Sequence, residues 1–221
     1  MKRQNLSRQS GFTLVEIAIV LVIIGLLLGG VLKGQEMIEN AKIKNVINDL
    51  KGVSAAYYSY QDRYKAIPGD DAAASTRFTG AVNGGGNGAI AGVYTAVVAP
   101  ALAAESNNFW QHTRMAGLLS GVATATVALP GTHAAGGVLG VQANAYGITG
   151  TVVCGGSIPW KMAQAIDTQL DDGNSATGSI RASLAGAANL ATTAVANSVY
   201  GPTVPATAIL EAGIHTVCMK I

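Results

Sequence analysis

The chain has 221 residues, of which 49% are hydrophobic, 12% charged and 5% aromatic. Lys2, Arg3 and Arg8 are 3 of its 14 basic residues, so without the first eleven positions the balance is 11 basic against 12 acidic residues, or −1. This near-neutral balance argues against a strongly basic nucleic-acid-binding protein. Because Ala, Gly, Val and Thr dominate, a small-residue domain of strands and loops is expected rather than a Leu-rich helical bundle.

A nearly unbroken apolar segment follows the basic start and runs from Phe12 to Leu32, with Thr13 and Glu16 as its strongly polar residues. About 20 apolar residues are enough to cross a bilayer as a helix. Basic residues before such a span mark its cytoplasmic flank, so the C-terminal part is expected to be exported. A signal peptide is cut at small residues after its apolar core. No such site follows Leu32, and the sequence predicts a retained membrane span.

The helical pattern continues beyond this span, because apolar residues recur three and four apart as far as Tyr64. The first half of the helix is apolar all round, and the second half is amphipathic, as expected if it packs on a soluble domain. The sequence predicts one helix of about 50 residues, roughly 75 Å long. It is expected to end before Ile67-Pro68-Gly69-Asp70-Asp71, because proline cannot continue a helix.

The remaining residues, 66–221, are expected to form a small globular head. Two short amphipathic helices are predicted, Glu105–Leu119, with Ser106 as N-cap and Gly121 beyond its end, and Trp160–Leu170. Short strands separated by glycines are predicted at Thr124–Leu129, Gly137–Gln142 and Gly147–Cys154, and an edge strand within Ile209–Met219. Asn83–Ile90 is predicted to be a flexible loop, and Thr177–Val204 is low in complexity and predicted to be variable or weakly stranded.

Glu16 is the most informative residue of the apolar segment. An unpaired carboxylate in lipid costs several kcal/mol, so an ionisable residue in a span suggests a function and a partner. The candidate partner is the α-amino group that cleavage between Gly11 and Phe12 would create. Pairing between neighbouring subunits would fix the axial stagger of a helical assembly. The alternative is a Glu16 that reaches water at the membrane edge.

The segment Gly11-Phe12-Thr13-Leu14-Val15-Glu16, between a short basic leader and an apolar helix, resembles the cleavage and methylation motif of type IV prepilins and type II secretion pseudopilins. The resemblance covers about residues 1–65. It implies removal of leader 1–11 by a prepilin peptidase, N-methylation of Phe12, and assembly through stalk helix 12–65, whose residues 12–32 are the membrane span or filament core. Glu16 matches the family's glutamate. The implied fold is α+β and pilin-like, a long N-terminal helix packed on a small antiparallel β-rich head.

The resemblance implies a structural role in a homo-oligomeric helical filament for adhesion, motility or DNA uptake. The implied partners are the peptidase and methylase, the pilus or secretion assembly machinery, and the inner membrane before assembly, with the pilus at the cell surface as the final location. Two alternatives remain open: a minor pilin or periplasmic type II secretion pseudopilin, and a monomeric membrane-tethered binding protein. His112, His133 and His215 lie in no nucleophile or metal motif, so no catalytic residue is expected. Nothing points directly to nucleic acid.

Cys154 and Cys218 both lie in the part expected to be exported. Two cysteines in an oxidising compartment most simply form one disulfide; two buried free thiols are the alternative. No cofactor is expected, with one weak exception. Asp167, Asp171, Asp172 and Asn174 follow the second short helix and offer the oxygen ligands that calcium prefers. Some pseudopilins bind calcium. The alternative is a helix C-terminal turn with solvated acids.

Overall fold

The computed structural model describes residues 13–95, 104–124, 128–184 and 213–221. The chain divides into two compact units that meet between Ala41 and Lys42. Each unit is treated by itself below, and residues 42–221 are called the C-terminal unit.

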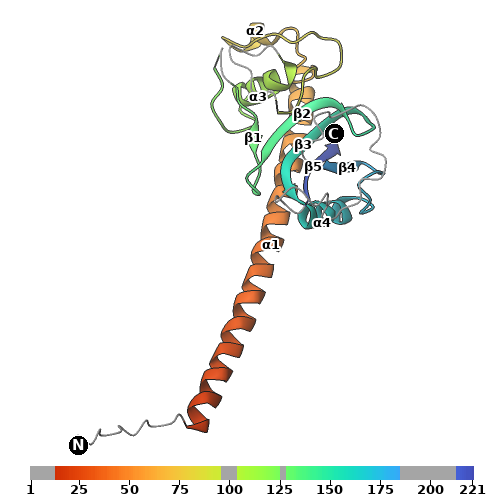
Figure 1. Ribbon diagram of the computed structural model, residues 1–221. Helices are drawn as coiled ribbons and strands as arrows, with labels where there is room; N and C mark the ends of the chain where they lie inside the picture. Colours follow the sequence, from red (N-terminus) through yellow and green to blue (C-terminus); the bar gives the residue numbers. More distant parts are fainter. Residues whose placement is uncertain (1–12, 96–103, 125–127, 185–212) are drawn as a thin grey trace, which may run out of the picture. The chain divides into compact units, whose positions relative to one another are not determined.

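The long helix α1 runs from Leu14 to Tyr64, 51 residues in all, and confirms the predicted continuous helix (Figure 1). Its residues up to Lys42 are exposed or half-buried, whereas eight later ones are buried at spacings of three and four: Ile43, Val46, Ile47, Leu50, Val53, Ala56, Tyr57 and Tyr60. These eight positions form the apolar stripe that the amphipathic pattern predicts. Lys65 follows the helix with a φ of 54°, and Pro68 bars its continuation.

A five-stranded antiparallel sheet forms the β part of the C-terminal unit, in the order β1-β2-β3-β5-β4. The strands are β1 (Gly131–Thr132), β2 (Val138–Ala145), β3 (Ile148–Pro159), β4 (Ile180–Leu184) and β5 (Ile214–Lys220). With α1 this confirms the predicted α+β, pilin-like architecture. Figure 1 shows the long β2 and β3 side by side.

The structure corrects the expected edge strand near the C-terminus. β5 lies between β3 and β4, so both of its edges are hydrogen-bonded, and β1 and β4 are the outer strands. Alternation along a strand reports which faces are buried and says nothing about how many neighbours the strand has. The second neighbour, β4, comes from the stretch that the sequence marks as low in complexity, most of which lies outside the described residues.

Two further boundaries differ from the sequence prediction. None of the described residues of the expected strand Thr124–Leu129 is in a strand, and residues 125–127 lie outside the described ranges. Helix α3 spans Glu105–Met115 and ends well before Gly121. Its N-cap is Ala104, which makes no side-chain capping bond. Ser106 is buried one position inside the helix, and its N–H donates to the Ala91 carbonyl at 3.0 Å. Helix α4, Trp160–Leu170, confirms its prediction.

One hydrophobic core joins these elements within the C-terminal unit. It combines side chains of α1, α3, α4 and the sheet, among them Leu50, Phe109, Val153, Ile166 and Val217, each fully buried. Burial of a large apolar side chain stabilises by about 1.5–3 kcal/mol, so this cluster is the main source of folding free energy.

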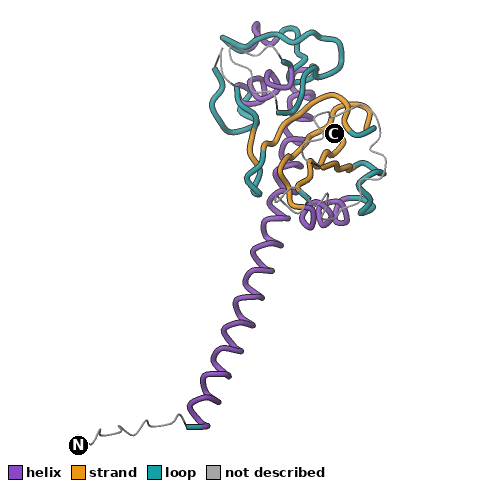
Figure 2. The backbone as a smooth tube through the Cα atoms, viewed as in Figure 1, coloured by secondary structure: helices purple, strands orange, loops and turns teal. Residues whose placement is uncertain are grey.

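The described residues between α1 and α3 are mostly loop and include the four-residue helix α2 (Ala74–Arg77) (Figure 2). Acidic side chains organise this loop. Asp70 accepts the backbone N–H groups of Asn87 at 3.0 Å and Gly88 at 2.6 Å, and Glu105 accepts that of Gly85 at 2.6 Å. The Asp71 and Asp70 carbonyls accept the N–H groups of Gly84 and Gly86, each at 2.9 Å. The glycine-rich stretch Asn83–Ile90 is thus held by acidic side chains and loop carbonyls, because its backbone donors have no strand or helix to pair with.

Candidate functional site

Thr13 and Glu16 form a reciprocal cap at the start of α1. The Glu16 Oε2 accepts the backbone N–H of Thr13 at 2.7 Å and the Thr13 hydroxyl at 2.7 Å. The Glu16 backbone N–H donates back to the Thr13 Oγ1 at 3.3 Å. This is a capping box, which satisfies two donors that a helix N-terminus otherwise leaves unpaired.

The capping box gives Glu16 a partner that the sequence reading missed, although Thr-x-x-Glu at 13–16 is the spacing that signals it. Gly11 and Phe12, the predicted cleavage residues, lie outside the described residues. The Phe12 amine would exist only after cleavage. Before that event the carboxylate is already bonded to its own helix, which lowers the cost of holding it in an apolar segment.

The apolar half of α1 offers an uncovered surface. Every residue from Leu14 to Lys33 is exposed, with Leu14 at 85% and Leu26 at 73%. A Cβ added at Gly25, Gly29, Gly30 or Gly34 would meet nothing within 4 Å. The helix is long and apolar enough to cross a membrane by length and composition, with a mean hydropathy of 2.8 in its best window. Such a surface requires lipid or other apolar helices around it.

The two cysteines are joined in a disulfide, as the sequence predicts. Cys154 on β3 and Cys218 on β5 are register partners, with Cα atoms 4.1 Å apart, and both are fully buried. Tyr146 and Val152 pack around them in a second small core. Burial raises the pKa of the Tyr146 hydroxyl to about 12, although a hydrogen bond to Thr216 acts in the opposite direction. The bridge links two neighbouring interior strands of the sheet.

Three of the four calcium candidates converge. Asp167, Asp171 and Asp172 each bring a carboxylate oxygen within 4.8 Å of the others at the C-terminal end of α4. Asp167 is fully buried, Asp171 is the C-cap of the helix, and Asp172 is exposed. Asn174 makes a hydrogen bond within its own loop, because its Oδ1 accepts the Ala176 N–H at 3.1 Å.

The same carboxylates also accept protein donors. Asp171 Oδ2 accepts the N–H groups of Ser179 at 2.6 Å and Ile180 at 2.9 Å, which fixes the start of β4. Asp172 accepts the Thr177 hydroxyl at 2.5 Å and the Asn174 N–H at 2.8 Å, and these bonds lower the pKa of its carboxyl. Both lone pairs of Asp171 Oδ2 are taken by these bonds, so a cation would be held through Asp171 Oδ1 and the remaining lone pairs of Asp172. The oxygen-only donor set fits calcium.

A buried polar network, which the sequence reading did not identify, connects the end of α1 to the loop after it. The Asp71 carboxylate accepts the Tyr60 hydroxyl and pairs with the Arg77 guanidinium. His112 Nδ1 accepts the Gly69 N–H at 2.9 Å, so its Nε2 carries the hydrogen and donates to the Val82 carbonyl at 2.7 Å. The sequence predicts only a turn at 67–71. The residues of this network are spread from Tyr60 to His112, and no local sequence pattern predicts that they come into contact.

Comparison with known proteins adds evidence at the N-terminus. No curated protein and no solved structure matches the chain. A family model described as the prokaryotic N-terminal methylation motif matches residues 6–32, a range that contains the predicted cleavage residues, the capping box and the apolar half of α1. Residues 6–32 are therefore the type IV prepilin and pseudopilin signature, the N-terminal motif of a prepilin peptidase substrate.

Proposed function

We propose that the chain is a structural subunit, not an enzyme, of a type IV pilus-like filament. The observation that carries the proposal is the exposed apolar surface of α1 from Leu14 to Leu32, which lies within the matched methylation motif. In the precursor this surface is covered by the lipid of the inner membrane. In the filament it is covered by the same surface of neighbouring copies, so extraction from the membrane exchanges one apolar environment for another.

Cleavage between Gly11 and Phe12 removes leader 1–11 with its three positive charges and creates a new amine one residue before Thr13. Glu16 then has two possible partners: Thr13 of its own chain, which it already contacts, and the Phe12 amine of a neighbour. Thr13 offers the carboxylate only neutral donors, whereas the Phe12 amine brings a full positive charge, and a pair of opposite charges among apolar helices is the stronger interaction. The carboxylate therefore leaves its cap when a neighbour's amine arrives, and this exchange sets the axial stagger.

In the proposed division, 1–11 is the leader, 12–65 the stalk helix and 66–221 the head that coats the filament. The compact C-terminal unit begins earlier, at Lys42, because the buried stripe of α1 belongs to the same core as the sheet. The proposed partners are further copies of the chain, a prepilin peptidase and methylase, and the assembly machinery of a pilus or secretion system. The proposed final location is the cell surface.

The test uses the native host lacking the gene, complemented with wild type, Glu16→Ala or Glu36→Ala. Glu36 is a matched control because it is an exposed glutamate of the same helix whose recorded partner is Lys33. Mass spectrometry of sheared surface material should find wild type and Glu36→Ala beginning at N-methylated Phe12. Glu16→Ala should be cleaved but strongly reduced in the sheared fraction.

Each result discriminates among the open alternatives. An uncleaved chain in every fraction would contradict the proposal. Normal assembly of Glu16→Ala would contradict the proposed role of Glu16. Full activity of that variant in the membrane, without surface filaments, would favour a tethered binding protein. Processed wild type confined to the membrane fraction would favour a minor pilin or a periplasmic pseudopilin.

A further inference from the structure

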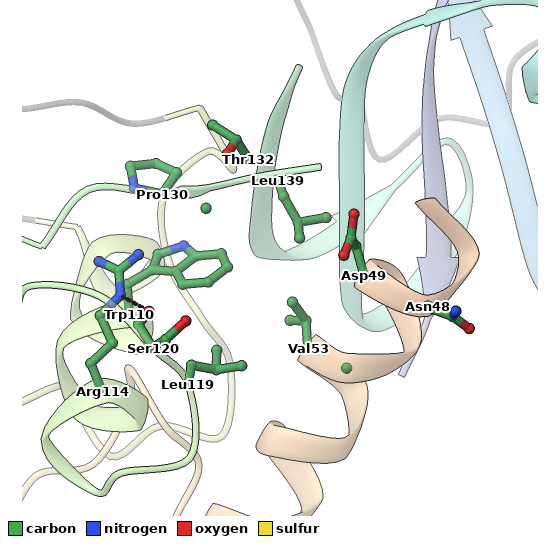
Figure 3. Close-up of a pocket in the computed structure, with 12 residues that line it drawn as sticks. Asn48, Asp49, Val53, Trp110, Arg114, Leu119, Ser120, Pro130, Thr132 and Leu139 are labelled. Carbon is green, nitrogen blue, oxygen red and sulfur yellow. Dashed lines mark hydrogen bonds between the residues drawn. The ribbon is translucent and has the colours of Figure 1, made fainter. Parts of the chain in front are cut away.

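A cavity of about 420 Å³ lies inside the C-terminal unit, next to Trp110 of α3 (Figure 3). Small-molecule sites commonly measure about 300–1,000 Å³. One wall comes from α1, with Asp49, Gly52 and Val53, and the opposite wall comes from α3 and the loop that leads into β1. In Figure 3 the indole of Trp110 lies in the middle of the lining residues, with Asp49 across the cavity from it.

Two glycines keep this space open. Gly52 lies in the interior of α1, where glycine is a poor helix former, and a Cβ placed on it would meet nothing within 4 Å. Packing within the described residues does not require a glycine there, and a side chain would extend into the cavity. Gly131 opens β1, and its Cβ would lie 2.8 Å from the Trp110 ring. Because glycine has no Cβ, the Gly131 backbone can lie directly against the indole.

Trp110 has an unused hydrogen-bond donor. The side chain is 3% exposed, and its Nε1 is buried without a hydrogen-bond partner among the described residues. In Figure 3 the nitrogen edge of the ring lies on the side of Pro130, another lining residue. Buried donors in folded proteins nearly always have an acceptor. A ligand oxygen would supply an acceptor that none of the described residues supplies.

The cavity walls carry one charge of each sign, so an ionic ligand of either sign meets a like charge. The Arg114 guanidinium lies 5.1 Å from the Trp110 ring centre, in the place a ligand cation would take. It is held there by bonds to the carbonyls of Ser120 at 3.2 Å, Val122 at 3.3 Å and Leu129 at 2.7 Å. On the other wall the Asp49 carboxylate repels anions, while accepting the Ala134 N–H at 2.9 Å.

We propose that this cavity binds a neutral sugar ring. Such a ring offers a hydroxyl oxygen to the Trp110 N–H, a hydroxyl proton to Asp49, and apolar C–H faces to Val53 and Leu139, which also line the cavity. A sugar ring has both apolar C–H faces and hydroxyl groups, and an aromatic side chain beside a carboxylate can contact both. The assignment concerns the C-terminal unit alone and is independent of filament assembly.

The test uses the full chain purified in a zwitterionic, sugar-free detergent. The chain has two tryptophans, so Trp160→Phe makes Trp110 the sole indole fluorophore. In that background we titrate the methyl glycosides of glucose, galactose and mannose, and N-acetylglucosamine, with phosphate and choline as an anion and a cation. At least one sugar should change the Trp110 emission saturably, with a Kd of about 1–10 mM, as expected for a monosaccharide in an open site.

Gly52→Leu should fill the cavity and weaken this binding by about tenfold or more. Lys51→Leu is the matched control, since it adds leucine at an exposed neighbour that does not line the cavity, and it should bind as wild type. No saturable response to any sugar would overturn the proposal. So would a response to choline or phosphate alone, or sugar binding unchanged by Gly52→Leu.

Discussion

The Tyr60 hydroxyl donates a 2.7 Å hydrogen bond to the Asp71 carboxylate, and this bond fastens the last turn of α1 to the loop that follows Pro68. Tyr60 is fully buried and Asp71 is 3% exposed. Burial of Asp71 alone would raise the pKa of its carboxyl, but the bonds from Tyr60, Ala73 and Arg77 outweigh burial and lower it. The pKa of the Tyr60 hydroxyl is raised, first by burial and second by its hydrogen bond to Asp71.

Tyr60→Phe removes the donor and leaves the ring. Loss of a hydrogen bond to a buried charged group costs about 1–3 kcal/mol, so the free energy of unfolding should fall by that amount. Denaturant unfolding of the full chain in detergent measures it. Tyr58→Phe is the control, because Tyr58 is 54% exposed and should change stability little. Equal stability of the two variants would show that the bond contributes nothing net.

Acidification should destabilise the C-terminal unit through His112. Burial lowers the pKa of His112 in the folded state, although its bond to the Val82 carbonyl acts the other way. Below the ordinary histidine pKa of about 6.5 the unfolded chain binds the proton first, so stability falls as pH drops from there through the lowered folded pKa. Above this window both states are neutral and His112 contributes no pH dependence.

The denaturation midpoint between pH 7 and pH 5 tests this expectation. His112→Gln keeps an acceptor and a donor without a titrating ring, so it should be less stable at pH 7 but show a flatter pH slope. Burial also lowers the pKa of His215, and part of the slope should therefore remain in the variant. An unchanged slope in His112→Gln would contradict the assignment.

The Cys154–Cys218 bridge should be a large single contribution to stability. It spans 64 residues in sequence, and closing a loop of that size stabilises by about 4 kcal/mol in the chain-entropy model. The double variant Cys154→Ala/Cys218→Ala should therefore unfold at a much lower denaturant concentration. Without a reductant, thiol labelling should find no free thiol in the native or the unfolded chain, because both sulfurs are in the bridge. With a reductant, labelling should wait for unfolding, because both cysteines are fully buried. Rapid labelling of the native chain would contradict this prediction.

The two cavity glycines should respond oppositely to alanine. Gly131→Ala forces a Cβ to within 2.8 Å of the Trp110 ring, and overpacking of this kind costs about 1–3 kcal/mol. Gly52→Ala meets open space and gains about 1 kcal/mol of helix propensity. Thermal unfolding of both variants beside wild type checks the signs. Destabilisation by Gly52→Ala would mean that the helix needs glycine for a reason other than the cavity.

Calcium binding at Asp167, Asp171 and Asp172 remains a prediction. Millimolar calcium should raise the Tm of the full chain relative to EDTA, because a ligand that binds only the folded state stabilises it. Asp172→Asn should abolish this difference, and since Asp172 is exposed the variant should still fold. An equal Tm with calcium and with EDTA would contradict calcium binding. The three acids would then serve only to end α4 and to hold the loop after it.

Local patterns in the sequence determined the long helix, its amphipathic second half, helix α4, the position of β3 near Cys154 and the processing motif. Each depends on residue spacing or on a few adjacent residues, so each is visible without knowledge of the fold. The capping box is equally local, because Thr13 and Glu16 are three residues apart, although the sequence assigned Glu16 only the Phe12 amine as a partner.

Tertiary structure alone decided which strands are central. β5 is interior because β4 pairs with its far side, and that pairing depends on contacts between distant segments. It also decided that Asp70, Asp71, Glu105 and His112 bond the loop after α1, and that Gly52 and Trp110 face one cavity. Buried polar groups must find partners wherever the fold brings them, so their roles follow from packing and not from sequence spacing.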